Sequence, residues 1–423
     1  MNTTAQKRLS PTVYYLLTGL ALSWPGLLAS GHLFTEWSQG LTETPISLGT
    51  IHLLILGSML TIAFGVIYQI VPIAFQAPPI QRDVLYWHLP LHILAVVTIV
   101  IGFLFSHYDL VGAGGLLLLI TTVAYGFLVF RSYSRARNQT LVHKTLSLPL
   151  ISLFIVLCIG IFQAFFPPLV SHSVLTSHVI VGGFTFWGAL VITFSYKLVP
   201  MFALSHGYSV SLSRTIRLYF IGVISIFISL WIANPLFSRV LSFSGSLLVI
   251  FALFSFIRDM ILIIRSRKRR RIVLPLFNAL VSTGCFVIGH ILLMLAILLQ
   301  NRSFLIPSVF LFGFGGIMPL MFAYIQKIVP FLWFEYRFSK RPERKQAPAI
   351  DEMVPRGISQ MGIGVYYAGV VCGLLVLLQG NISSQSLWTY IQWLAAIFMT
   401  SGSLLLFLAL RHVLTIGGPR PQE

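Results

Sequence analysis

The feature that most constrains this chain is a succession of long apolar segments. A helix needs about 20 mostly apolar residues to cross the hydrocarbon core of a membrane. Charged residues make up only 9% of the 423 residues, too few to solvate the surface of a soluble protein. The predicted fold class is therefore all-α, a polytopic membrane bundle of about 12 transmembrane helices. We expect them over residues 11–31, 49–75, 84–106, 110–131, 146–167, 174–200, 214–233, 239–265, 272–300, 304–333, 360–380 and 388–414.

The placement of the basic residues indicates the orientation of these helices. The net charge of +18 would suit a nucleic-acid partner if the positive residues formed one patch. With the N-terminus placed inside, however, all 28 Lys and Arg residues except Arg239 and Arg302 fall in inner segments or at inner helix ends. This is the positive-inside pattern. It predicts an integral protein of a bacterial-type cell membrane with both termini in the cytoplasm, and no nucleic-acid partner.

One inner loop carries the densest run of positive charge, RSRKRRR at residues 265–271. Such a run is a topology signal, and binding of anionic lipid head groups is the alternative reading. Membrane lipids are the expected partners in either case.

Three segments resemble one another at a regular interval, which indicates a repeated unit. Residues 52–72 read HLLILGSMLTIAFGVIYQIVP, residues 178–200 read HVIVGGFTFWGALVITFSYKLVP, and residues 308–330 read SVFLFGFGGIMPLMFAYIQKIVP. Their final prolines lie 128 and 130 residues apart. The predicted bundle is therefore a pseudo-threefold repeat of four helices in a single integral membrane domain, 1–423. The polar segment 334–359, which contains three prolines, is expected to be a cytoplasmic loop.

The ionisable residues within the predicted helices limit the class of protein. None of the ten Asp and Glu residues is expected near the membrane centre. Cation-coupled transporters and proton pumps commonly use a buried carboxylate there, so their class is disfavoured.

Histidine is the most informative residue type in these helices. His52 and His178 begin two of the repeated segments, each five residues before a glycine, and are expected near the outer face. His290 lies ten residues before Gln300, which puts it roughly 15 Å below the outer end of its helix. The three side chains are expected to converge in the outer half of the bundle. Imidazole is a common metal ligand and a usual haem axial ligand. Each of the three is therefore a candidate cofactor and metal ligand, and a hydrogen-bonded packing residue is the alternative.

A second pair of histidines, His88 and His92, has the i, i+4 spacing that places both side chains on one face of a helix. A metal-binding pair and two histidines at a helix interface are both open readings.

Twelve helices, a threefold four-helix repeat and His52 at the outer start of the second helix together resemble subunit I of the haem-copper oxidases. That superfamily includes the nitric oxide reductases, and the NnrS-like membrane proteins look like a looser relative. The resemblance covers the architecture of about residues 50–415 and is specific only around 52–72 and 178–200. It implies that His52 matches the ligand of the low-spin haem. It also implies that His178 approximately matches the histidine that binds copper.

The chain departs from this family where the oxygen-reducing centre would lie. The predicted helix over 214–233 has no His-His pair for copper, and the helix over 304–333 has no histidine. Gly182 stands four residues after His178, where some oxidases have a tyrosine. We therefore expect no oxygen-reducing centre of the usual kind, and the resemblance does not say whether His290 replaces a lost ligand.

Two functional hypotheses follow from the sequence. The first is a haem-binding relative of the oxidase subunit, with haem b as the expected cofactor and copper as a second candidate. It would act in respiratory electron transfer, nitric oxide handling or haem and copper traffic, with other respiratory membrane subunits as partners. The second is a cofactor-free transporter or a structural membrane subunit. The sequence leaves open whether the protein is an enzyme.

Overall fold

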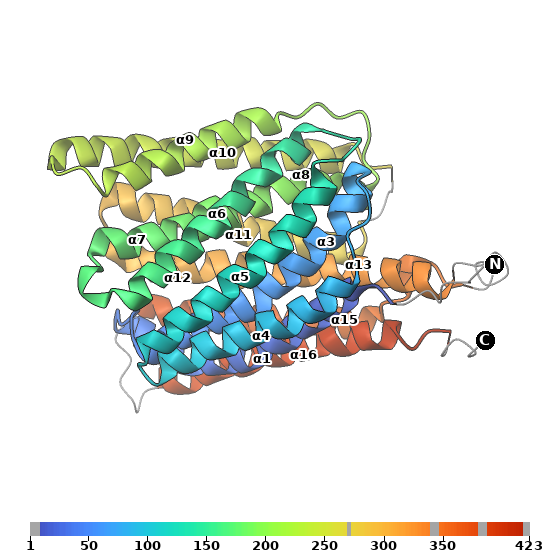
Figure 1. The fold of residues 1–423 in the computed structure, drawn as a ribbon, viewed down its shortest axis with the longest axis horizontal. Coiled ribbons are helices and arrows are strands. Elements are labelled where there is room, and N and C mark those ends of the chain that lie inside the picture. Colours follow the sequence, from blue (N-terminus) through green and yellow to red (C-terminus); the bar gives the residue numbers. More distant parts are fainter. Residues whose placement is uncertain (1–8, 269–271, 339–346, 380–386, 418–423) are drawn as a thin grey trace.

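The structure is a computed structural model that describes residues 9–268, 272–338, 347–379 and 387–417. Within these ranges the chain forms helices and no β-strand, and 12 helical spans are long and apolar enough to cross a membrane. They lie side by side along the long axis of the molecule (Figure 1). The spans are α1 (Pro11–Ser38), α2 with η1 and α3 (Pro45–His52, Leu53–Leu60, Thr61–Phe75), α4 (Asp83–Leu104), α5 (Tyr108–Tyr133), α6 (Leu141–Phe165), α7 with η3 and α8 (His172–Ile180, Val181–Gly188, Ala189–Ala203), α9 (Leu212–Ser229), α10 (Pro235–Arg265), α11 (Leu274–Leu299), α12 with η5 and α13 (Leu305–Phe310, Leu311–Ile317, Met318–Arg337), α15 (Arg356–Gln379) and α16 (Leu387–Val413).

The prediction of an all-α polytopic bundle of about 12 helices is confirmed, and the helix bounds differ from it by a few residues. The largest difference is at α1, which continues to Ser38 because its last turns are packed: Phe34 and Trp37 are buried, and Thr35 donates a hydrogen bond to Gln392 of α16 at 3.0 Å. Within the predicted loop 334–359, α13 continues to Arg337 and a 3-10 turn spans Ile350–Glu352. Residues 339–346 of this loop lie outside the described part of the chain.

The contacts between helices follow the repeat. The first helix of each repeat packs on the second, as α1 does on α3, α6 on α8 and α11 on α13. The third helix packs on the fourth in the pairs α4 and α5, α9 and α10, and α15 and α16. The fourth helices α5 and α10 contact the first helix of the following repeat, and α16 contacts α1. The three repeats therefore close into a ring, which Figure 1 shows by the red α16 lying along the blue α1.

The second helix of each repeat lies inside this ring. In the most apolar windows of these three spans, 72%, 72% and 67% of the residues are buried, whereas every other described span reaches 50% or less. The three meet around a small cavity of about 40 Å³, lined by residues that include Ala63, Trp187 and Met321. The repeated segments found in the sequence are thus the core of the bundle.

Each of these inner helices contains a π-helical segment at the same place. The segments η1, η3 and η5 all begin 19 residues before the proline that ends the repeated motif, Pro72, Pro200 or Pro330. A π-helix forms i to i+5 hydrogen bonds, so carbonyl groups at its junctions with α-helix lose their usual partner. In a membrane interior every such group must find a partner within the protein.

In each repeat a side chain of the third helix bonds to one carbonyl of the π segment. The acceptor carbonyls are those of Leu56, Phe184 and Phe314, each 16 residues before the motif proline. His92 Nε2 of α4 lies 3.2 Å from the oxygen of Leu56. Tyr219 of α9 donates to Phe184 at 3.1 Å, and Tyr366 of α15 donates to Phe314 at 2.9 Å. Three buried polar side chains of the third helices therefore make the same contact in three places.

This arrangement predicts that the buried hydroxyl groups stabilise the fold. Tyr219→Phe and Tyr366→Phe each remove one buried side-chain hydrogen bond to a π-segment carbonyl. We expect each to lower the free energy of unfolding by about 0.5–2 kcal/mol, the range of buried hydrogen bonds in membrane proteins. Thermal unfolding of the purified protein in detergent measures the change. Tyr390→Phe, on an exposed side chain, is the control and should leave stability unchanged.

Candidate functional site

His52 and His178 are brought together at the end of the bundle opposite to that where α1 begins and α16 ends. His52 is the last residue of α2, and His178 lies on α7, which Figure 1 shows at this end. Their ring centroids are 6.4 Å apart with an angle of 35° between the rings. The two side chains come from different repeats and are separated by more than 120 residues in the sequence.

The hydrogen bond made by His52 fixes which of its nitrogens is free. Nδ1 lies 2.7 Å from the carbonyl oxygen of Leu48, one turn earlier in α2. Because a carbonyl only accepts, Nδ1 carries the proton and Nε2 carries the lone pair. Metal-binding histidines commonly donate their other ring N–H to a backbone carbonyl in this way. His178 adds a buried Nδ1 with no hydrogen-bond partner.

The surroundings of the pair are apolar and include two glycines that make room. Phe103 of α4 stacks at 4.6 Å from the His52 ring. A β-carbon at Gly160 of α6 would lie 3.0 Å from Cε1 of His178, so this glycine allows the ring to fit against α6. A β-carbon at Gly183 would meet nothing within 4 Å, whereas one at Gly57 would meet the side chains of Leu53 and Val96. Gly183, five residues after His178, therefore has open space beside it, whereas Gly57, five residues after His52, does not.

The separation of the two rings suits a single metal atom between them. Metal–nitrogen bonds to imidazole are about 2.0–2.1 Å long. Since the centre of the ring lies about 1 Å beyond its nitrogen, two imidazoles on opposite sides of one atom have centroids roughly 6 Å apart. The observed 6.4 Å is close to this value. The donor set, two imidazoles with one tautomer fixed, fits the iron of a haem as well as a copper ion.

The structure shows that His52 and His178 do not occupy equivalent positions in their repeats, although each lies five residues before a glycine. When the repeats are aligned on their π segments, His52 precedes η1 directly, whereas two residues separate His178 from η3. The positions therefore differ by two residues, about 3 Å along the axis and more than half a turn around it. The matched five-residue spacing to a glycine does not reflect equivalent positions.

His290 does not complete a three-histidine centre, because the described residues contain no group of three His, Cys, Asp or Glu side chains that could hold a metal ion. It is buried on α11, and its Nε2 lies 3.1 Å from the hydroxyl of Tyr219. Since that hydroxyl donates to the carbonyl of Phe184, it accepts from Nε2–H of His290. The rings of Phe184, Phe286 and Phe312 enclose the imidazole at 4.8–5.0 Å. In this position His290 orients Tyr219, which donates to the carbonyl of Phe184 in the π segment η3.

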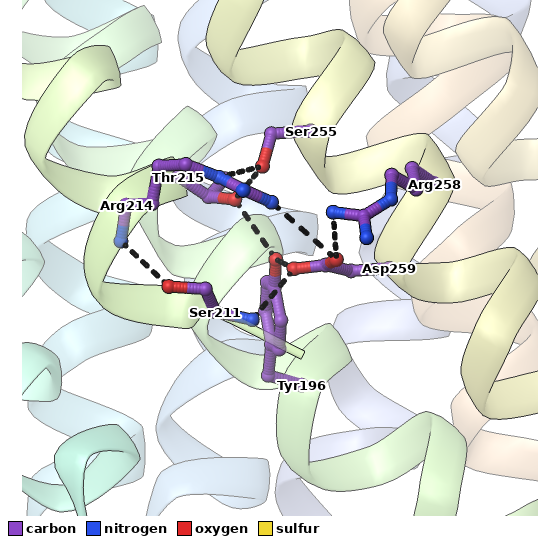
Figure 2. Close-up of polar contacts among 7 residues, drawn as sticks. All are labelled: Tyr196, Ser211, Arg214, Thr215, Ser255, Arg258 and Asp259. Carbon is purple, nitrogen blue, oxygen red and sulfur yellow. Dashed lines mark hydrogen bonds and ion pairs between the residues drawn. The ribbon is translucent and has the colours of Figure 1, made fainter. Parts of the chain in front are cut away.

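A buried carboxylate that the sequence did not single out lies at the other end of the bundle. Asp259 of α10 is fully buried, and Figure 2 shows the side chains around it. Its Oδ2 accepts from the hydroxyl of Tyr196 at 2.7 Å and from the backbone N–H of Ser211 at 3.0 Å. Arg214 and Arg258, both largely exposed, lie 3.9 and 4.0 Å from Oδ1 and compensate its charge.

This cluster ties three segments of the second repeat together. Tyr196 stands four residues before Pro200 on α8, and Ser211 caps the start of α9. The equivalent residue in the first repeat, Tyr68, donates to the carbonyl of Ile80 in the segment that leads to α4. In the third repeat Gln326 accepts from Ser359 at the start of α15. The position four residues before the motif proline therefore binds the approach to the third helix in every repeat.

A comparison with protein-family models finds no match, and a comparison with curated proteins finds none at a significant level. The class of protein that the fold defines is therefore stated from the structure itself: an integral membrane protein built as a closed ring of three four-helix repeats.

The Asp259 cluster generates a test of its structural role. Asp259→Ala removes the acceptor from Tyr196 and from the N–H of Ser211. We expect it to lower stability by about 1–3 kcal/mol, the cost of leaving buried groups without a partner. Asp259→Asn keeps an acceptor oxygen and should cost less than the alanine variant. Thermal unfolding of both is compared with Asp109→Asn, a change at an exposed position that should have no effect.

Proposed function

We propose that this protein binds haem b through His52 and His178 and is a relative of subunit I of the haem-copper oxidases. The single observation that carries the proposal is the pair itself. Two imidazoles from different repeats lie at the separation that one metal atom requires, and the free nitrogen of His52 is defined by its bond to Leu48. The closed ring of three four-helix repeats supports the relationship.

The chemistry of the site favours electron transfer over oxygen reduction. A bound haem would supply a one-electron couple, and His52 and His178 would hold it. In this proposal Leu48 holds the ring of His52 in one tautomer, Gly160 gives His178 its place, and Phe103 excludes water. Among the described residues no third His, Cys, Asp or Glu joins the pair as a further metal ligand. Respiratory electron transfer, with other membrane subunits as partners, is therefore the favoured role, ahead of nitric oxide handling and of haem or copper traffic.

The proposal is tested by the absorption spectrum of protein purified from haem-replete cells. Wild-type protein should show a Soret band and about one haem per chain. His52→Ala and His178→Ala should each abolish or shift this band, because each removes one of the two side chains that would hold the haem. His290→Ala should lower stability without moving the band of the folded protein, since His290 bonds Tyr219 instead. His206→Ala, at an exposed position, is the control.

A protein that folds with no haem, or variants of His52 and His178 that keep the wild-type spectrum, would refute the assignment. Purified apoprotein would favour the alternative function, a cofactor-free transporter or a structural membrane subunit.

We further propose that both termini face the cytoplasm of a bacterial-type cell, on the strength of the basic residues. A reporter active only in the cytoplasm should be active when fused after Glu423. The same reporter should be inactive when inserted after Gly40, an exposed position in the connection between α1 and α2. Reversed activities at both sites would invert the orientation of the bundle.

A further inference from the structure

Three basic side chains gather at the end of the bundle where α1 begins, far from the two histidines of the candidate haem site. Arg135 and Arg137 lie in the connection between α5 and α6, and Lys197 lies near the end of α8. No hydrogen bond or ion pair joins the side chain of any of the three to another described residue. Charged groups at the ends of membrane spans are normally paired or hydrated, so these three are candidates for binding an anion.

The two arginines line a hollow of about 220 Å³, together with residues 76–78 that follow α3. Backbone hydrogen bonds hold its two sides together. The N–H of Arg137 donates to the carbonyl of Gln76 at 3.5 Å, and the N–H of Asn138 donates to the carbonyl of Phe75 at 3.0 Å. The hollow is several times larger than the roughly 30 Å³ that one water molecule occupies in the liquid. It therefore has room for a group larger than water.

Lys197 adds a third positive charge beside this hollow. Its ammonium nitrogen lies 5.8 Å from the centre of the Phe75 ring, and Phe75 directly precedes the first residue of the hollow. The lysine side chain is half-buried, and Phe75 is fully buried. An ammonium group is strongly hydrated, so holding it half-buried without an anion is unfavourable.

The other two repeats show how the position of Lys197 is normally satisfied. The residue three before the motif proline is Gln69 in the first repeat, Lys197 in the second and Lys327 in the third. Gln69 is neutral and accepts hydrogen bonds at 3.2 Å from two hydroxyl groups at the start of α1. Lys327 forms an ion pair with Asp351. Lys197 alone among the three has a charge that no described carboxylate compensates.

The sequence around the hollow explains why the chain supplies no anion. Residues 44–82 and 110–258 contain no Asp or Glu. These ranges include α3, α6, α8 and the connection between α5 and α6. The excess of positive charge is therefore local, and an anion that compensates it has to come from another molecule.

We propose that this hollow binds the phosphate group of an anionic phospholipid, with Arg135 and Arg137 donating to its oxygens and Lys197 adding the third charge. The planar fork of a guanidinium matches two oxygens of a phosphate. Basic pockets between transmembrane helices are known to bind phospholipid head groups. The segment that carries the arginines is flanked by Phe130 of α5 and Leu141 of α6, which are 62% and 41% exposed. This apolar surface favours a lipid over a free phosphate ion, because it offers a place for the acyl chains.

The test measures lipid binding to delipidated protein in detergent by native mass spectrometry. Phosphatidylglycerol is the anionic probe, and phosphatidylcholine, which has the same phosphate group but no net charge, is the neutral one. Inorganic phosphate is added as a competitor to distinguish a lipid from a free anion. The double variant Arg135→Gln with Arg137→Gln is compared with the double variant Arg217→Gln with Arg411→Gln. The control removes the same charge from two exposed side chains on α9 and α16.

Wild-type protein and the control should bind phosphatidylglycerol more tightly than phosphatidylcholine. The Arg135 and Arg137 variant should bind phosphatidylglycerol about 25-fold more weakly, about fivefold for each lost cation, and phosphatidylcholine as before. Lys197→Gln should weaken the binding of phosphatidylglycerol about fivefold.

Equal affinities of the double variant and its control for phosphatidylglycerol would overturn the proposal. So would a wild-type protein that binds the two lipids alike. Inorganic phosphate that displaces phosphatidylglycerol at equal concentration would show that the site takes a free anion, which also contradicts it. His52 and His178 are unchanged in every protein compared, so none of these results bears on the haem assignment.

Discussion

The constraint on which the rest of this structure depends is that backbone polar groups inside a membrane must find partners within the protein. The inner helix of each repeat departs from α-helical hydrogen bonding at a π segment. His92, Tyr219 and Tyr366 of the third helices each bond to a carbonyl of this segment. The ring of three repeats is therefore held by directional bonds to its core as well as by apolar packing.

The same three hydrogen bonds use different donor side chains in different repeats. The first repeat uses an imidazole where the other two use a phenol, and an imidazole has a second nitrogen left over after the bond is made. His92 consequently carries a free lone pair inside the bundle, next to His88. His290 supports one of the phenols, Tyr219. Two of the buried histidines are thus linked to the π segments, although they are 198 residues apart in the sequence.

The departure from threefold symmetry creates the candidate haem site. His52 and His178 belong to corresponding helices, but they differ by two residues in register, so their side chains do not point in equivalent directions. That offset lets one imidazole approach the other across the boundary between two repeats. In the third repeat Ser308 stands where His178 does in the second, and its hydroxyl donates to the carbonyl of Leu305. The ring therefore has one histidine pair at this end.

The sequence by itself determined the class of fold, because the length of an apolar segment decides whether it can cross a membrane, and this property is local. It also determined the repeat, since residues 52–72, 178–200 and 308–330 match without reference to any contact. The sequence proposed that His52, His178 and His290 converge, but it compared the first two through a spacing that is not structurally equivalent, and His290 lies apart from them. Only the tertiary structure decided which histidines meet, that Asp259 is buried, and that each π segment accepts a side-chain hydrogen bond from the third helix. Those outcomes depend on contacts between helices far apart in the chain, and a one-residue change in register turns a side chain by about 100°, which no local pattern records.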